Sequence, residues 1–233
     1  MGRMRSFLKQ WTSTHPRLNA LVRRLRRRPV FHRVSRRIRG KRNRWQAHWT
    51  AVIDRVSVEV HGNDNIITIG SGCDVRHLKI RIYGDGHRIT IANNVRFSQG
   101  GTLWFEDSGG SLDIGPDTTI EAADISITER GSRVEIGRDC MLAYDIDIRT
   151  GDSHSILDAN TRSRLNPAAC VRLGDHVWVA AHCILLKGSA LADDSILAAG
   201  AVLTKAIAES GCVVGGNPAR ILKRGVTWDR RRL

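Results

Sequence analysis

The first 50 residues of this 233-residue chain contain no aspartate and no glutamate, although they hold 16 of its 37 lysines and arginines. Basic and acidic side chains nearly balance over the rest, so the net charge of +14 comes from the amino-terminal arm. The chain also lacks the ~18-residue apolar run that spans a bilayer and the ~7 to 15 apolar residues of a secretory signal. These absences predict a cytoplasmic protein.

Paired cysteines are also missing. The five cysteines, Cys73, Cys140, Cys170, Cys183 and Cys212, are scattered singly, with no CxxC motif and no histidine at zinc-finger spacing. This pattern is typical of a reduced compartment. No cluster of His, Cys, Asp and Glu has the spacing of metal ligands, so we expect no metal.

In the carboxy-terminal half, an aliphatic residue stands at every sixth position. These positions are Leu173, Val179, Leu185, Leu191, Leu197 and Leu203. A helix repeats its face every 3.6 residues and a simple strand every two, so neither explains this spacing. The period predicts very short parallel strands that stack coil upon coil, each directing one aliphatic side chain inward.

A related quartet, apolar-x-apolar-Gly/Ala, recurs upstream. It occurs at 67–70, 89–92, 112–115 and 134–137, with steps of 22, 23 and 22 residues, and next at 171–174, a step of 37. Each unit is expected to form one coil of three rungs. About fifteen extra residues should therefore leave the stack before residue 171.

The two periods predict an all-β fold, a parallel β-helix. We divide the chain into a basic, helical arm at 1–54, the β-helix at 55–208 with an active-site loop at 149–170, and a carboxy-terminal tail at 209–233. The arm is expected to be helical because Leu18, Leu21, Val22 and Leu25, and then Phe31, Val34 and Ile38, recur at helical spacing among arginines.

Several motifs within about residues 55–233 resemble the hexapeptide-repeat acyltransferases, in particular the branch that O-acetylates sugars of cell-surface polysaccharides. They are IRTGDSHSI at 148–156, NPA at 166–168, GDHVWV at 174–179, ILLKG at 184–188, LTK at 203–205, GNPAR at 216–220 and WDR at 228–230. The chain departs from the family at 180–181, where two alanines replace a Gly-led pair, and at 206–208. The resemblance implies a left-handed β-helix, a homotrimer, and acetyl-coenzyme A bound between neighbouring subunits.

His154 is the candidate general base. Transfer of an acetyl group to a sugar hydroxyl requires removal of the hydroxyl proton, and an imidazole with a pKa near 6.5 can accept it at cellular pH. A loop on a rigid scaffold is a common place for such a residue. Asp152 or Asp145 is expected to orient the ring, and the sequence does not decide between them. The alternative is that His154 only caps a turn.

The resemblance also assigns the cofactor site. It places Trp178, Ala181 and Ala199 beside the pantetheine arm and Thr204, Lys205 and Arg220 near the nucleotide, where phosphates require positive charge. Trp178 as a packed surface aromatic is the alternative. For the acceptor saccharide we select Arg149, Arg162, Arg164 and Asn166 around the loop, because guanidinium groups suit carboxylates and phosphates. The alternative is that these four are ordinary solvated loop residues.

Residues 1–50 are interpreted as a basic amphipathic segment that caps the solenoid and contacts the inner face of the membrane, where polysaccharides are assembled. We favour this over nucleic-acid binding, which is the usual alternative for arginine-rich segments.

The sequence thus predicts an acetyl-coenzyme A-dependent O-acetyltransferase that acts on a cell-surface saccharide or its precursor. Two alternatives remain open. One is an N-acetyltransferase of a nucleotide-linked amino sugar, and the other is a non-catalytic scaffold whose basic arm binds membrane or nucleic acid.

Overall fold

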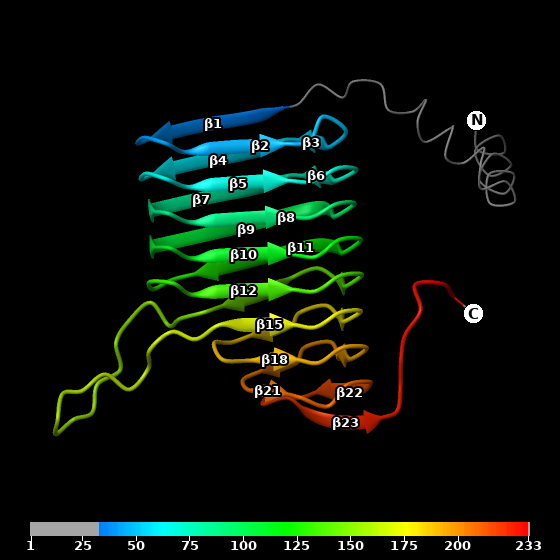
Figure 1. The fold of residues 1–233 in the computed structure, drawn as a ribbon. Coiled ribbons are helices and arrows are strands. Elements are labelled where there is room, and N and C mark those ends of the chain that lie inside the picture. Colours follow the sequence, from blue (N-terminus) through cyan, green and yellow to red (C-terminus); the bar gives the residue numbers. More distant parts are fainter. Residues whose placement is uncertain (1–32, 233) are drawn as a thin grey trace, which may run out of the picture. The chain divides into compact units, whose positions relative to one another are not determined.

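The structure is a computed structural model that describes residues 33–232, and this part of the chain contains strands and no helix (Figure 1). The strands stack as parallel rungs of a solenoid. One exception in this range is β23 (Arg220–Arg224), which runs antiparallel to β22 (Cys212–Gly215). The predicted all-β parallel β-helix is confirmed.

One side of the solenoid is a sheet of eight strands, which we call face 1. Its strands are β2 (Arg44–Ala47), β5 (Ile66–Ile69), β8 (Arg88–Ile91), β10 (Ser111–Ile114), β12 (Arg133–Ile136), β15 (Val171–Leu173), β18 (Ala190–Leu191) and β21 (Ala206–Ile207). The predicted quartets form this face, since Ile89 pairs with Leu112 and Val134 pairs with Val171.

The other two sides belong to a sheet of fifteen strands. Face 2 contains β3 (Val52–Asp54), β6 (Asp74–Arg76), β13 (Met141–Leu142), β16 (Trp178–Val179), β19 (Ile196–Leu197) and β22. Face 3 contains β1 (Val34–Arg39), β4 (Val56–His61), β7 (Leu78–Asp85), β14 (Ile146–Arg149), β17 (Ile184–Leu185) and β20 (Val202–Leu203). The long strands β9 (Arg96–Ser108) and β11 (Thr119–Ile127) continue from face 2 to face 3.

The six-residue period corresponds to one inward-facing aliphatic side chain on each successive face, as predicted. Leu173, Val179 and Leu185 lie on faces 1, 2 and 3 in turn, and each is at most 2% exposed. Eighteen residues later the same faces receive Leu191, Leu197 and Leu203, in register. Apolar side chains therefore fill the inside of the column along its length.

The chain turns between faces at three corners: corner A follows face 1, corner B follows face 2, and corner C follows face 3. Backbone of positive φ recurs there, at Asp139, His176 and Asp194 in corner A, Asp145 and His182 in corner B, and Ser153 and Gly188 in corner C. Asn and Asp tolerate this conformation better than most residues because their side chains bond locally to the backbone.

The boundary expected at residue 54 has to be corrected. Residues from Val34 onward already form the first coil, because all six residues of β1 pair with β4 and the strand is extended. Val34 and Ile38 are four residues apart, a spacing that fits one face of a helix and also one face of a strand. The rest of the predicted helical arm, residues 1–32, lies outside the described residues.

The boundary at residue 208 also moves. The strand β22 pairs with β19 and is the last rung of face 2, and β23 covers its outer edge. An antiparallel cover of this kind satisfies backbone groups that an open solenoid end would expose. None of the described residues form a helix that is long and apolar enough to cross a membrane.

Candidate active site

A long loop leaves the solenoid at corner C, between β14 and β15 (Figure 1). Ile136 pairs with Leu173, which is 37 residues away, whereas Ile114 pairs with Ile136 at a distance of 22. The predicted excursion of about fifteen residues is therefore present. An antiparallel bridge between Leu157 and Arg164 makes its outer part a hairpin.

The root of the loop is buried. The hydroxyl of Thr150 accepts a hydrogen bond from the backbone N–H of Thr128 (3.0 Å) and donates one to its carbonyl (3.1 Å). The next residue, Gly151, is also buried, and a Cβ there would lie 2.6 Å from the Thr128 hydroxyl. The loop therefore starts from a fixed position.

Asn166 connects the two sides of the loop. Its amide nitrogen donates to the carboxylate of Asp152 (2.7 Å) and to the backbone carbonyl of His154 (2.8 Å), and its amide oxygen accepts from the N–H of Ile156 (2.6 Å). The side chain of Asn166 is buried. These three bonds fix the backbone on both sides of His154.

Two ion pairs attach the loop to neighbouring coils. The ammonium group of Lys187 donates to Asp152 (2.5 Å) and to the carbonyl of Asn166 (3.0 Å), and the guanidinium of Arg164 binds both oxygens of Glu129. The Lys187 bond lowers the pKa of Asp152, and the Arg164 bond lowers that of Glu129. Both carboxylates are thus ionised at neutral pH.

His154 is exposed on this braced loop. Its backbone N–H donates to the backbone carbonyl of Asp152 (2.7 Å). Its ring has no hydrogen-bond partner in the part of the chain that the structure describes. The backbone is fixed and the imidazole is free. Such a group can accept a proton from a bound hydroxyl.

The two candidate orienting carboxylates lie in different places. Asp152 is on the loop, but the hydrogen bonds of its carboxylate go to Lys187 and Asn166, not to the ring of His154. Asp145 lies in corner B, at the other end of β14, and contacts the ring of His182 (2.6 Å). Because β14 has four residues and a strand rises about 3.3 Å per residue, the chain does not bring Asp145 to His154.

Among the acceptor candidates, Arg164 and Asn166 brace the loop. Arg149, at the end of β14, is exposed and pairs with Asp147 (2.8 Å), and Arg162 is exposed on the hairpin. The four residues are therefore all in or beside the loop, and the side chains of Arg149, Arg164 and Asn166 already have partners within the chain.

The cofactor candidates lie in four places along the carboxy-terminal coils. Trp178 is half-buried in β16, while Ala181 and Ala199 stack at corner B, where the N–H of Gly200 donates to the carbonyl of Ala181 (3.0 Å). Thr204 and Lys205 are exposed between β20 and β21, and Arg220 is exposed at the start of β23. In the described residues no group of three or more His, Cys, Asp and Glu side chains is arranged to hold a metal.

Sequence reasoning missed Glu129 and Lys187. Glu129 precedes the loop by more than twenty residues, and Lys187 follows it by nearly as many, so nothing in either local sequence indicates a contact with the loop. Both meet it because successive coils place their corner C residues next to one another.

No family model matches this chain. It is 32% identical over 182 residues to a polysialic acid O-acetyltransferase of Neisseria meningitidis, covering 78% of this chain and 83% of the relative. A second polysialic acid O-acetyltransferase, from Escherichia coli O1:K1, is 34% identical over 122 residues, covering 52% of this chain and 39% of the relative.

Comparison with solved structures leads to the same group of enzymes. The polysialic acid O-acetyltransferase OatWY superposes with a TM-score of 0.79 at 30% identity, covering 87% of this chain and 93% of that one. The polysialic acid-specific acetyltransferase NeuO gives 0.78 at 29% identity, covering 85% and 89%. The chain therefore belongs to the polysialic acid O-acetyltransferase family of hexapeptide-repeat, left-handed β-helix enzymes and is itself an acetyltransferase.

Proposed function

We propose that this protein transfers an acetyl group from acetyl-coenzyme A to a hydroxyl of an acidic cell-surface polysaccharide, with His154 as general base. The observation that supports this assignment is the braced loop. Five polar side chains from three coils hold the backbone around His154, and its exposed ring has no hydrogen-bond partner among the described residues.

The residues at corner B and in the last coils suit coenzyme A. Ala181 and Ala199 have no side chain beyond Cβ, so an extended pantetheine arm can approach the backbone between them. Lys205 and Arg220 are exposed cations for its phosphates, with Thr204 beside them. The bound molecule would supply the acetyl group as an activated thioester.

The imidazole of His154 removes the proton from the acceptor hydroxyl as that oxygen attacks, and later releases it to the leaving thiolate. Asp152 acts through the loop: its carboxylate binds Lys187 and Asn166, and Asn166 binds the carbonyl of His154. Holding a catalytic group in position in this way lowers the entropic cost of reaching the transition state.

For the acceptor, the names of the relatives point to polysialic acid, whose sugar units each carry a carboxylate. The exposed guanidinium groups of Arg149, at the start of the loop, and Arg162, on its hairpin, suit such carboxylates. Arg164 and Asn166 contribute through the bracing of the loop.

We also propose that the enzyme is a homotrimer. Large apolar side chains are exposed in corner B, on the loop hairpin and in the carboxy-terminal coils, among them Tyr144, Ile156, Leu157, Leu165, Ile184 and Leu222. Large apolar side chains that a monomer would leave in solvent are commonly covered at contact surfaces between subunits. Light scattering coupled to size-exclusion chromatography should give a mass near 78 kDa, about three times that of the 25.9 kDa chain, and a monomer would contradict the proposal.

The test of the chemistry is the variant His154→Ala with polysialic acid and acetyl-coenzyme A. We expect kcat to fall by about 10²- to 10⁴-fold, the range for loss of a general base, while coenzyme A binding and oligomeric state persist. His48→Ala, an exposed histidine in the first coil, serves as the control. A folded His154→Ala enzyme with near-normal kcat would refute the assignment.

Product analysis separates the remaining alternative. An O-acetyl ester is removed by mild alkali, whereas an N-acetyl amide survives, so alkali-stable product on a nucleotide-linked amino sugar would favour N-transfer. The scaffold alternative is set aside because the family is enzymatic.

Residues 1–50 are proposed to contact anionic membrane at its inner face, with nucleic acid as the disfavoured partner. Sedimentation with vesicles that contain anionic lipid should require these residues and weaken with salt.

A further inference from the structure

The segment after β23 returns along corner A and crosses several coils. It starts where the N–H of Val226 donates to the carbonyl of Gly211 (2.9 Å) and reaches as far as Thr119, more than a hundred residues earlier in the chain. We call residues 226–230 the strap.

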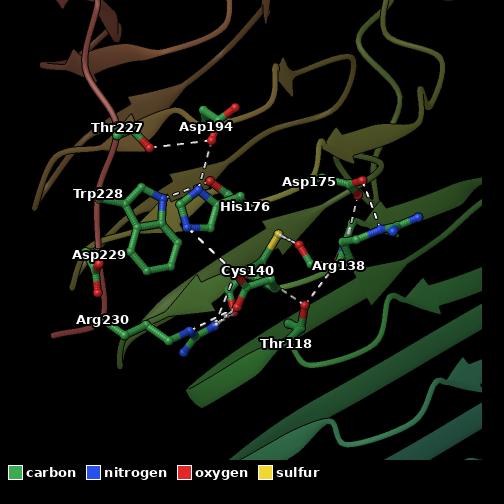
Figure 2. Close-up of polar contacts among 12 residues, drawn as sticks. Thr118, Arg138, Cys140, Asp175, His176, Asp194, Thr227, Trp228, Asp229 and Arg230 are labelled. Carbon is green, nitrogen blue, oxygen red and sulfur yellow. Dashed lines mark hydrogen bonds and ion pairs between the residues drawn. The ribbon is translucent and has the colours of Figure 1, made fainter.

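Trp228 is the centre of the strap and is 8% exposed. Its ring stacks on the imidazole of His176, with centroids 4.2 Å apart and planes 6° from parallel. Its indole N–H donates to the carbonyl of His176 (2.8 Å), and the His176 ring contacts Asp194 (2.9 Å), as Figure 2 shows. The indole is therefore held by both stacking and a hydrogen bond.

Arg230 fastens the far end of the strap (Figure 2). Its guanidinium donates to the carboxylate of Asp139 (3.0 Å), the hydroxyl of Thr119 (2.8 Å) and the carbonyl of Cys140 (2.9 Å). It also lies 5.4 Å from the centroid of the Trp228 ring, at cation–π distance. The strap is thus anchored on both sides of the indole.

The strap meets the candidate donor site at Trp178. The rings of Trp228 and Trp178 are 6.2 Å apart at 52°, within the range of interacting aromatic pairs. Met141 and Ile196 pair with Trp178 from the coils on either side. Trp178 itself is only half-buried, so part of its surface is available to a ligand.

This arrangement compensates for short strands. In this region β13, β16 and β19 have two residues each, so few backbone hydrogen bonds hold the rung that carries Trp178. A tryptophan at the end of such a rung can adopt several rotamers, and fixing one in advance reduces the entropic cost of ligand binding.

We propose that Trp228 is a positioning residue, which holds the ring of Trp178 in place for the pantetheine arm of the acetyl donor. This inference rests on the proposed function, because it takes coenzyme A as the ligand at Trp178. It assigns to the strap a role in donor affinity, distinct from acceptor recognition.

The experiment measures coenzyme A binding by calorimetry and steady-state kinetics with each substrate varied. Trp228→Ala should raise the Kd for coenzyme A and the KM for acetyl-coenzyme A about tenfold, and leave the KM for polysaccharide within about twofold. Trp228→Phe, which keeps a ring on His176, should recover most of the affinity. Arg231→Ala is the control, because Arg231 is exposed and pairs with Asp229.

Equal binding by Trp228→Ala and the wild type would overturn the proposal, as would donor and acceptor constants that worsen by the same factor. If Trp228→Ala does not fold, Arg230→Ala carries the same test. Fluorine NMR with 5-fluorotryptophan adds a readout without ligand: the Trp178 signal must shift or broaden in Arg230→Ala, and an unchanged signal also overturns the proposal. Wild type that binds no coenzyme A would instead refute the proposed donor.

Discussion

The amino-terminal and carboxy-terminal coils solve the same stacking problem with different amounts of backbone pairing. Around β7 and β9 the strands reach 8 and 13 residues, and coils repeat every 22 or 23 residues. From β16 to β20 each strand has two residues, and the repeat is 18. The longer coils contribute most of the hydrogen-bond ladder, whereas the shorter ones place more of the chain in corners.

The candidate site residues lie in the second kind of coil or where the two kinds meet. The loop starts at corner C immediately after β14, and Ala181 and Ala199 stack at corner B. Exposed corner residues such as Asp145 and His182 can change type without breaking the ladder, because their side chains point to solvent. The long-stranded coils thus stabilise the column, and the short-stranded coils carry most of the residues proposed for donor binding.

The largest expected effect is on the free energy of unfolding, and it should differ between a glycine of the long-stranded coils and one of the short-stranded coils. Gly84, in the long-stranded part, has φ +137, and a Cβ there would overlap the carbonyl of Asp107 on the next coil. Gly188 has φ +74, and a Cβ there would make only a normal van der Waals contact with Ala169 (3.6 Å). Gly84→Ala should lower the free energy of unfolding by about 3 kcal/mol or more, since strain and overlap add, and Gly188→Ala by about 1 kcal/mol.

Urea unfolding followed by circular dichroism measures both variants. Similar, small losses for Gly84→Ala and Gly188→Ala would contradict the idea that the long-stranded coils depend on close backbone approach.

The next largest effect is a loss of activity when the loop, which lies where the two kinds of coil meet, loses its brace. Asn166→Ala removes the three hydrogen bonds that fix the backbone beside His154, so kcat should fall about tenfold or more while most of the column stays folded. Asn160→Ala, at the exposed tip of the hairpin, should change kcat less than twofold. Hydrogen exchange should increase in residues 150–170 of Asn166→Ala, and unchanged kcat would show that the loop needs no brace.

The smallest effect is on pH dependence. His87, buried in the long-stranded coils, accepts a hydrogen bond at Nδ1 from Gly110 (3.0 Å), and its Nε2 has no partner among the described residues. Burial lowers its pKa below the ordinary 6.5. As the pH falls, the unfolded chain therefore binds a proton at His87 before the folded chain does. The free energy of unfolding that is present above pH 6.5 thus decreases as the pH falls below that value.

Glu129 and Asp152 have depressed pKa values, so the stability that they contribute is lost only below their ordinary values, near pH 4. Between pH 7.5 and 5.5 the long-stranded coils should weaken first. His87→Asn is the matched variant, because Asn65 occupies the same place one coil earlier. The side-chain oxygen of Asn65 accepts from the backbone N–H of His87 (2.8 Å), as Nδ1 of His87 accepts from that of Gly110. The urea midpoint of His87→Asn should change less over this range than that of the wild type, and equal changes would contradict the assignment to His87.

Much of the fold could be predicted because its signal is local and repeated. Six-residue recurrence placed Leu173, Val179 and Leu185 inward on successive faces, and the change from a step of 22 to one of 37 located the loop. The helical interpretation of residues 31–38 failed for Val34 and Ile38, since a spacing of four suits a strand as well. Pairing with β4 decided between them.

The sequence by itself determined the column, the position of the excursion and the presence of His154 on it, because hydrophobic periodicity and its interruption are properties of the chain order. Only the tertiary structure decided which side chains hold the loop and the strap. Lys187 reaches Asp152 because stacking places the corners of successive coils about 4.8 Å apart, whatever their separation in the chain. Trp228 reaches His176 because the strap runs back across those corners. Contacts of that kind leave no periodic trace in the sequence.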